Sequence, residues 1–216
     1  MDRGELLELI RKAKESRVER NFKQSVELIL ALKDIDVRRQ RLSINEVVFL
    51  PHKPGRDAKV CVIAGGDIAL RAKRAGADTV IPPEELDRLA TSKRDAKKLA
   101  KAHDFFLAEV SLMPKVGRAL GPILGPRGKM PTPIPPNAPV EAMISRFKSA
   151  ARFRTRGQLM VSGRIGSEDM GDEELADNAL AVISAVEKKL PQGLRNVKKV
   201  MVKLTMSPVV GLRVIR

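Results

Sequence analysis

Hydrophobic and polar positions follow two different rhythms in the first fifty residues. Residues 5–20 place apolar side chains among charged ones, at Leu6, Leu7, Leu9 and Ile10. This pattern predicts an amphipathic helix. Residues 24–35 instead alternate between the two faces of an extended chain. Glu27 lies on one face, and the other carries a row of apolar residues, Val26, Leu28, Leu30 and Leu32. Residues 44–51, INEVVFLP, follow a basic turn at Arg38, Arg39 and Arg41. The two alternating runs predict two antiparallel strands.

From residue 59 onward, short strand-like runs take turns with helical ones. KVCVIAGG, TVI and DFFLAEVSL are apolar and strand-sized, and helical segments lie between them. Pro82 and Pro83 are predicted to open one of these helices, because the first turn needs no N–H from proline. A further helix is predicted at VEAMISRFKSA. This alternation favours a small parallel sheet with helical crossovers.

The last third of the chain returns to strands. RFRTRGQLMVSGRIG predicts a strand pair, and a helix is predicted from Asp172 to Leu190 with acidic residues at its start. VKKVMVKLTMS and VVGLRVIR are both strand-like. Strands near both ends of the chain could therefore complete one sheet and leave the middle as an insertion. Periodicity permits this arrangement but does not decide it.

Charge points to an anionic partner. The 216 residues have a net charge of +15 and a pI of about 10.3, while 43% hydrophobic content suffices for a core. Nucleic acid is the default partner of such a chain, and an anionic membrane surface is the alternative. No apolar run is long enough to span a bilayer, and the N-terminal segment does not resemble a signal peptide, so we expect a cytoplasmic protein without a membrane partner.

Aromatic content restricts how a nucleic acid could be bound. Only 3% of residues are aromatic, with no Trp and no Tyr. Proteins that bind single strands stack bases on aromatic side chains, which this chain largely lacks. We therefore expect recognition of folded RNA or a duplex through shape, phosphate and sugar contacts.

Residues 120–137, LGPILGPRGKMPTPIPPN, concentrate glycine, proline and positive charge. A nucleotide-binding P-loop requires a glycine five residues before the Gly-Lys pair and a hydroxyl after it. This chain has Ile123 and Met130 at those positions, so the pattern fails at both. Two interpretations of the predicted loop stay open: a proline-stiffened linker with solvated charges, and a contact with an RNA backbone.

The remaining candidate residues for ligand binding, metal binding or catalysis are better explained by structural roles. Gly65 and Gly66 follow a strand, but G-G-D lacks the spaced third glycine of a dinucleotide site, so a tight turn with Asp67 as helix N-cap is predicted. His52, His103 and Cys61 are the only histidines and cysteine, which leaves no plausible metal cluster. Cys61 is expected to be a buried, inert thiol. We expect no cofactor, no metal and no catalysis.

The segment AKAHDFFLAEVSLMPKVGRALGPILGPRGKMPTPIPPN closely resembles the signature of ribosomal protein L1 in its archaeal form. RNFKQSVELILALKDID, EVVFLPHKPGR and VKKVMVKLTMSP resemble segments of the same family in the same order. The resemblance implies an α/β fold of two domains. Residues 1–64 plus 152–216 would form a split α/β domain I, the main RNA-binding domain. Residues 65–151 would form an inserted Rossmann-like, three-layer domain II.

The resemblance also implies which residues face RNA. They fall before and within the first strand and on the turn between the last two strands, at Arg20, Asn21, Phe22, Lys23, Gln24, Ser25, Glu27, Thr205, Met206, Ser207 and Pro208. Thr205 and Gln24 could hydrogen-bond a 2′-hydroxyl. Structural alternatives are that Met206 fills the core and that Phe22 acts as a hydrophobic staple. The family's turn usually reads Thr-Met-Gly-Pro, and this chain has Ser207 in place of the glycine.

By resemblance, the expected function is that of a non-enzymatic protein of the large ribosomal subunit. It would bind large-subunit rRNA, form the mobile stalk beside the tRNA exit site and help deacylated tRNA leave, as a monomer when free. Several members also bind their own mRNA and repress its translation, a role that nothing in this sequence decides. The alternatives are a nucleotide-dependent enzyme and a basic protein that binds nucleic acid without specificity.

Overall fold

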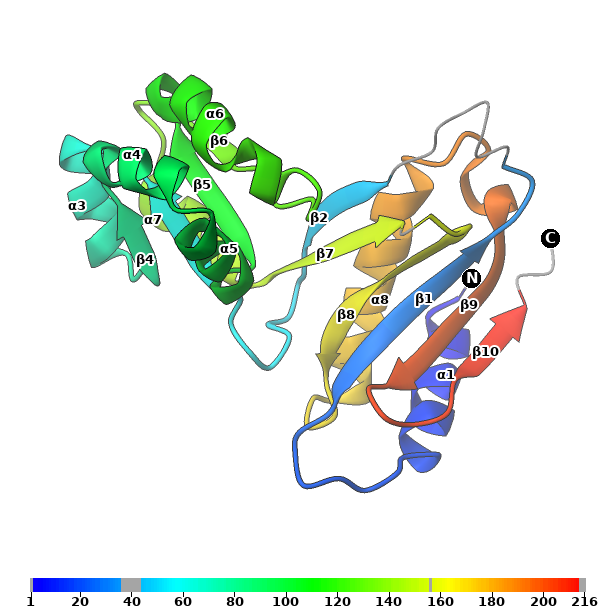
Figure 1. The fold of residues 1–216 in the computed structure, drawn as a ribbon. Coiled ribbons are helices and arrows are strands. Elements are labelled where there is room, and N and C mark those ends of the chain that lie inside the picture. Colours follow the sequence, from blue (N-terminus) through cyan, green and yellow to red (C-terminus); the bar gives the residue numbers. More distant parts are fainter. Residues whose placement is uncertain (1, 36–43, 156, 214–216) are drawn as a thin grey trace. The chain divides into compact units, whose positions relative to one another are not determined.

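The computed structural model describes residues 2–35, 44–155 and 157–213. The chain divides into two compact units, of which unit 1 comprises residues 1–57 and 149–216 and unit 2 comprises residues 58–148 (Figure 1). The basic turn predicted at Arg38, Arg39 and Arg41 lies outside the described residues. The middle of the chain is thus an insertion between two parts of one unit.

Unit 1 is built on a six-stranded antiparallel sheet. Its strands, in spatial order, are β10 (Val210–Arg213), β9 (Val197–Leu204), β1 (Ser25–Leu32), β8 (Met160–Ser167), β7 (Ala150–Thr155) and β2 (Asn45–Phe49). Strands from both parts of the chain therefore complete one sheet. The two strands predicted near the start, β1 and β2, do run antiparallel, but β8 and β7 lie between them.

Among the described residues, two helices cover one face of this sheet, α1 (Arg3–Glu15) and α8 (Asp172–Glu187), and both lie behind the strands in Figure 1. β1 buries every second residue, from Val26 to Leu32, against these helices, as its alternation predicts. A short 3₁₀ turn, η2 (Gly193–Asn196), leads from α8 toward β9. The alternate residues of the strands face away from the helices and form the open face of the sheet.

Unit 2 contains a four-stranded parallel sheet with helices on both faces. In spatial order its strands are β4 (Thr79–Ile81), β3 (Val60–Ile63), β5 (Phe105–Glu109) and β6 (Thr132–Ile134). The helices are α3 (Gly66–Arg74), α4 (Pro83–Thr91), α5 (Lys93–Ala102), the 3₁₀ turn η1 (Val110–Leu112), α6 (Met113–Leu124) and α7 (Val140–Lys148). α4, α5 and α6 bury one face, and Phe147 of α7 packs edge-on against Phe105 on the other. This three-layer, Rossmann-like arrangement confirms the predicted fold class, and Pro83 opens α4 as predicted.

The structure moves both expected domain boundaries by a few residues. β3 was placed in the first domain by the boundary at residue 64, but it pairs with β4 and β5 and belongs to unit 2. Residues 149–151 were placed in the inserted domain, but Ala150 and Ala151 pair with β2 in unit 1. In both places hydrogen bonding to a distant strand, which local periodicity does not report, sets the boundary.

Two local predictions in unit 2 are wrong. The predicted loop at residues 120–137 begins inside α6, because Val116, Leu120 and Leu124 recur every four residues and bury one stripe of that helix despite its Gly and Pro content. The same segment contains β6. The N-cap of α3 is Gly65 rather than Asp67. Gly66, with φ +51°, adopts the left-handed conformation that glycine accommodates most easily.

Candidate nucleic-acid interface

The segment between α1 and β1, residues 16–24, presents the first group of predicted RNA-facing residues. Helix α1 ends at Glu15, and Ser16 Oγ donates to the carbonyl of Ala13 at 3.1 Å, which satisfies one of the free carbonyls of the last turn. The next residues, 20–23, are exposed, and the strand begins at Ser25. Arg20, Asn21, Phe22 and Lys23 therefore project from a connection that is short and anchored at both ends.

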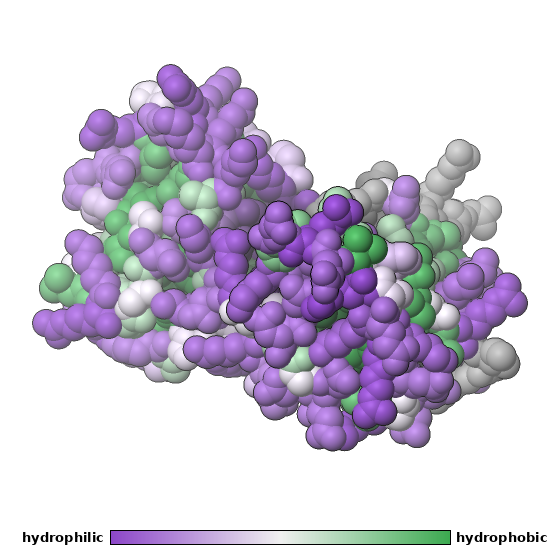
Figure 2. Space-filling model, turned by 90° about the horizontal axis from the view of Figure 1, so that it is seen from below, coloured by the Kyte–Doolittle hydropathy of each residue, from purple (hydrophilic) through white to green (hydrophobic). Residues whose placement is uncertain are grey.

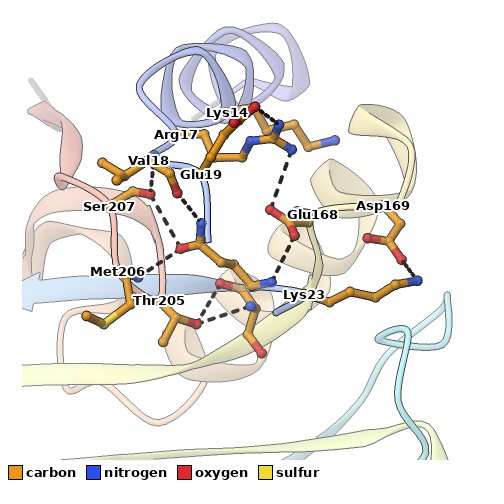
Figure 3. Close-up of polar contacts among 12 residues, drawn as sticks. Lys14, Arg17, Val18, Glu19, Lys23, Glu168, Asp169, Thr205, Met206 and Ser207 are labelled. Carbon is orange, nitrogen blue, oxygen red and sulfur yellow. Dashed lines mark hydrogen bonds and ion pairs between the residues drawn. The ribbon is translucent and has the colours of Figure 1, made fainter. Parts of the chain in front are cut away.

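Gln24 is the exception in this group, because its side chain is buried at 1% exposure. Its Nε2 donates to the carbonyl of Val18 at 2.7 Å, and its Oε1 accepts from the backbone N–H of Met206 at 2.9 Å (Figure 3). The amide thus joins the 16–24 segment to the turn between β9 and β10. Both polar atoms of this amide are hydrogen-bonded within the protein. Gln24 therefore supports the surface rather than reaching RNA.

Thr205 joins the same two segments from the other side. Its Oγ1 accepts from the backbone N–H of Ser25 at 3.1 Å and donates to the Ser25 carbonyl at 3.4 Å. The backbone N–H of Thr205 also donates to that carbonyl, at 3.1 Å. The structure therefore brings together the two sets of residues that the sequence resemblance selected, although 180 positions separate Ser25 from Thr205.

Ser207 occupies a conformation that does not require glycine. Among the described residues, Asp34 is the only non-glycine with a positive φ, so residue 207 has ordinary backbone geometry. Its hydroxyl oxygen accepts from the backbone N–H of Val18 at 3.1 Å and lies 3.5 Å from Gln24 Oε1 (Figure 3). The serine is therefore attached to the 16–24 segment through its side chain.

Exposed apolar side chains gather on these two segments. Phe22 is 50% exposed and Met206 53%, and Val18 and Val209 are also exposed. On the face drawn in Figure 2, the surface is mostly hydrophilic, with hydrophobic areas between the hydrophilic ones. The exposure of Met206 excludes the core-filling alternative, and a half-exposed Phe22 does not act as a buried staple. Both side chains are available to pack on a ribose or a base.

Carboxylates lie among the basic residues of this surface. Lys23 Nζ contacts Asp169 Oδ2 at 2.6 Å, and this ion pair raises the pKa of the lysine. Glu168 Oε1 accepts from the backbone N–H of Gln24 at 3.0 Å, and its Oε2 lies 3.7 Å from Arg17. The surface is therefore not uniformly positive. A phosphate that approaches Lys23 has to compete with Asp169.

The open face of the sheet supplies basic residues that sequence reasoning missed. Glu27 lies on this face, directly across from Lys203 on β9 and Arg164 on β8. Further cations occupy alternate positions on the same face, at Lys199, Arg213, Arg152 and Arg154. Arg164 is partly fixed by the carbonyls of Gly166 and Pro54. The alternation within each strand is enough to predict that these residues lie on the polar face. Only the order of the strands in the sheet makes them neighbours.

In the glycine-rich region of unit 2, the charge of Lys129 is used within the protein. Lys129 Nζ donates to the carbonyls of Ala100 and His103, at the end of helix α5, where a cation satisfies free carbonyls and the helix dipole.

At the start of α3, the backbone N–H of Gly65 donates to Glu109 Oε2 at 3.3 Å. A carboxylate of the protein thus lies where a Rossmann-type site would hold a phosphate. Neither contact supports a nucleotide site.

The other candidate residues have structural surroundings. Cys61 is fully buried and burial raises the pKa of its thiol, so the side chain is inert as expected. His103 is 6% exposed, with contacts from its ring nitrogens to the Leu99 carbonyl and Thr79 Oγ1. Within the described ranges, we find no cluster of three metal-ligating side chains and no helix with the length and apolar character needed to cross a membrane.

Comparison with known proteins places the chain in a family. A sequence profile of the ribosomal protein L1p/L10e family matches residues 11–208. This chain belongs to that family. It is 49% identical to the large ribosomal subunit protein uL1 of Cenarchaeum symbiosum, over 97% of this chain and 96% of that protein. The protein of the same name from Thermofilum pendens is 50% identical over 94% and 90%, and that of Methanocaldococcus jannaschii 45% identical over 99% and 97%.

The match to the L1 family includes both segments that contain the predicted RNA-facing residues. Both segments, residues 20–27 and 205–208, lie within the matched residues 11–208. The archaeal relatives confirm the resemblance that the sequence motifs indicated, and their names describe a ribosomal protein rather than an enzyme. The family assignment rests on residues 11–208, which are most of the chain, whereas the interface rests on the contacts between its two segments.

Proposed function

We propose that this protein is a component of the large ribosomal subunit and binds a folded region of its rRNA through unit 1. The observation that supports this most directly is the junction of residues 20–25 with residues 205–208. Gln24 and Thr205 hold these segments together, and both segments present exposed side chains. The names of the archaeal relatives give the ribosomal context.

The interface combines three kinds of contact. Arg20 and Lys23 are exposed cations suited to phosphate oxygens. Phe22 and Met206 offer apolar surface to riboses or bases. Thr205 Oγ1 already bonds to Ser25, but a hydroxyl has two acceptor lone pairs, and the second can accept from a 2′-hydroxyl. Such a mixture favours a shaped RNA over an arbitrary polyanion, since the carboxylates of Glu27 and Asp169 repel phosphates that are not correctly placed.

The open face of the sheet extends this interface. Lys203 and Arg164 flank Glu27, which belongs to the predicted set, and Lys199 and Arg213 continue the row. An RNA helix that contacts the junction of the two segments could place a further stretch of backbone along these side chains. Each phosphate neutralised there would add to the salt dependence of binding.

We also propose the finer roles that the family resemblance implies. The rRNA region would be the mobile stalk beside the tRNA exit site, in cytoplasmic ribosomes, and the protein would help deacylated tRNA leave. A similar RNA fold in its own mRNA would occupy the same residues of unit 1. Repression would then arise from competition between the messenger and rRNA for one surface.

Titration with the isolated stalk rRNA fragment tests the central proposal. Specific binding should survive a large excess of bulk tRNA and of duplex DNA, because those competitors offer phosphates without the required shape. If either competitor displaces the fragment in proportion to its phosphate concentration, the protein is a general polyanion binder. Its ribosomal role would then need another explanation.

A further inference from the structure

The backbone of Val18 is held by two side chains that come from different parts of the chain. Its carbonyl accepts from Gln24 Nε2 at 2.7 Å, and its N–H donates to Ser207 Oγ at 3.1 Å. Val18 lies outside regular secondary structure, between the end of α1 at Glu15 and the start of β1 at Ser25. Figure 3 shows both bonds converging on this residue. Among the described residues, neither polar group of the Val18 backbone has another hydrogen bond.

Gln24 and Ser207 differ in what they hold. Gln24 is buried, and it belongs to the segment that contains Val18. Its hydrogen bond to Val18 therefore joins two residues of the same segment. Ser207 belongs to the β9–β10 turn, so its bond to Val18 ties the middle of the segment to the other half of the interface. Both halves are therefore fixed relative to each other by Ser207 at one point and by the Gln24–Met206 and Thr205–Ser25 bonds at others.

We propose that Ser207 is a positioning residue of the RNA interface. Its hydroxyl fixes Val18, and through it the exposed residues 20–23, against the β9–β10 turn before RNA arrives. This proposal rests on the proposed function, because it concerns the same surface. The physical effect is preorganisation: a segment already held in its bound conformation loses less conformational freedom on binding. The family's usual glycine at this position has no side chain that could make the bond.

Ser207→Ala and Ser207→Gly test this inference. Both remove the hydroxyl, and both should weaken binding of the stalk rRNA fragment threefold to tenfold, in line with the loss of one hydrogen bond. Ser207→Thr keeps a hydroxyl and should restore most of the affinity. Ser184→Ala is the matched control, because Ser184 is an exposed serine of α8 that lies outside both segments of the interface, and this variant should bind within twofold of the original protein.

A second measurement needs no RNA. Hydrogen exchange at the Val18 amide should accelerate in Ser207→Ala and Ser207→Gly and stay slow in Ser207→Thr and Ser184→Ala. Val18 is 40% exposed, so water can replace the lost partner and the thermal midpoint should change little. Loss of affinity by general unfolding is thereby distinguished from loss of positioning.

The outcomes separate this inference from the function on which it rests. If the original protein binds the fragment specifically while the Ala and Gly variants match it in affinity and in Val18 exchange, Ser207 does not position the segment. If exchange accelerates but affinity is unchanged, the bond exists without serving RNA binding, and the inference is also wrong. If the original protein shows no specific binding, the proposed function itself fails.

Discussion

Gln24 Oε1 accepts a hydrogen bond from the backbone N–H of Met206 at 2.9 Å, across 182 positions of sequence. The glutamine is 1% exposed and the methionine 53%. One residue is thus a buried support and the other is part of the surface that it supports. Substitutions within the predicted set of RNA-facing residues should therefore differ in effect, according to whether the residue is buried or exposed.

Replacement of Gln24 should destabilise the protein as well as weaken RNA binding. Gln24→Leu has a similar volume but removes the two hydrogen bonds of this buried side chain, to the N–H of Met206 and the carbonyl of Val18, which costs about 1–3 kcal/mol of unfolding free energy. Urea denaturation measures this change. Gln158→Leu, at an exposed position, is the control and should stay within about 0.5 kcal/mol of the original. Equal stability of both variants would contradict the supporting role.

Lys23 and Thr205 should affect the salt dependence of RNA binding differently. Lys23→Gln removes an exposed cation, so the slope of log K against log salt should fall by roughly 0.7–0.9 if the side chain neutralises one phosphate. Thr205→Val removes an uncharged hydroxyl that bonds to Ser25, and should weaken binding with an unchanged slope. Titrations of both variants at several salt concentrations make the comparison. Equal changes in slope would show that the two roles are misassigned.

Asp169→Asn should strengthen binding at low salt. The substitution removes the carboxylate that holds Lys23 at 2.6 Å and frees the ammonium for phosphate. Affinity for unrelated duplex RNA should rise more than affinity for the stalk fragment, because an ill-fitting backbone gains most from the loss of repulsion. Filter binding with both RNAs measures the ratio. A lower affinity for both would indicate that Asp169 itself contacts RNA.

Unit 1 should suffice for specific RNA recognition, since the predicted interface lies entirely within it. Replacing residues 58–148 by a short Gly-Ser bridge should keep the affinity for the rRNA fragment within about tenfold, or about 1.4 kcal/mol. Circular dichroism and a cooperative thermal transition establish that the shortened protein is folded. A folded protein that has lost several orders of magnitude in affinity would place the main site in unit 2.

Lys129 should matter for the stability of unit 2 and not for RNA affinity in unit 1. Lys129→Met removes the cation that bonds to the carbonyls of Ala100 and His103, which should cost about 1–2 kcal/mol. Lys101→Met, at an exposed position in α5, is the control. Thermal unfolding and fragment titration of both variants test the assignment. A large loss of RNA affinity in Lys129→Met alone would restore the phosphate-contact interpretation of the glycine-rich segment.

Acid stability should depend on Arg3 and Asp177. The Arg3 guanidinium, 2.9 Å from Asp177 Oδ1, lowers the pKa of that carboxyl below its ordinary value of 3.8. A depressed native pKa stabilises the folded protein above the ordinary value, and this stabilisation is lost as pH falls through the native pKa. Arg3→Met should therefore lower the thermal midpoint at neutral pH and leave it nearly unchanged at the lowest pH at which both proteins fold. A constant difference across the whole pH range would contradict this linkage.

Most of the secondary-structure elements and the family follow from the amino-acid sequence alone. The alternation in residues 25–32 sufficed for β1, and the helical period sufficed for α1, because both patterns report burial on one side of a local element. The same reasoning failed for residues 120–124, where Gly and Pro suggested a loop. There, the buried stripe that includes Leu120 and Leu124 outweighs the low helix propensity of its neighbours.

Which of these residues act together depends on the packing of segments that lie far apart in the chain. Glu27 becomes a neighbour of Lys203 and Arg164 through the strand order β9-β1-β8, and hydrogen bonds across the fold assign Gln24 to the interior and Lys129 to the end of α5. These partners lie 26 or more positions apart in the chain. A residue's local pattern shows whether it faces the core or solvent, but its hydrogen-bond partner depends on how distant segments pack, and that packing is fixed by the whole fold.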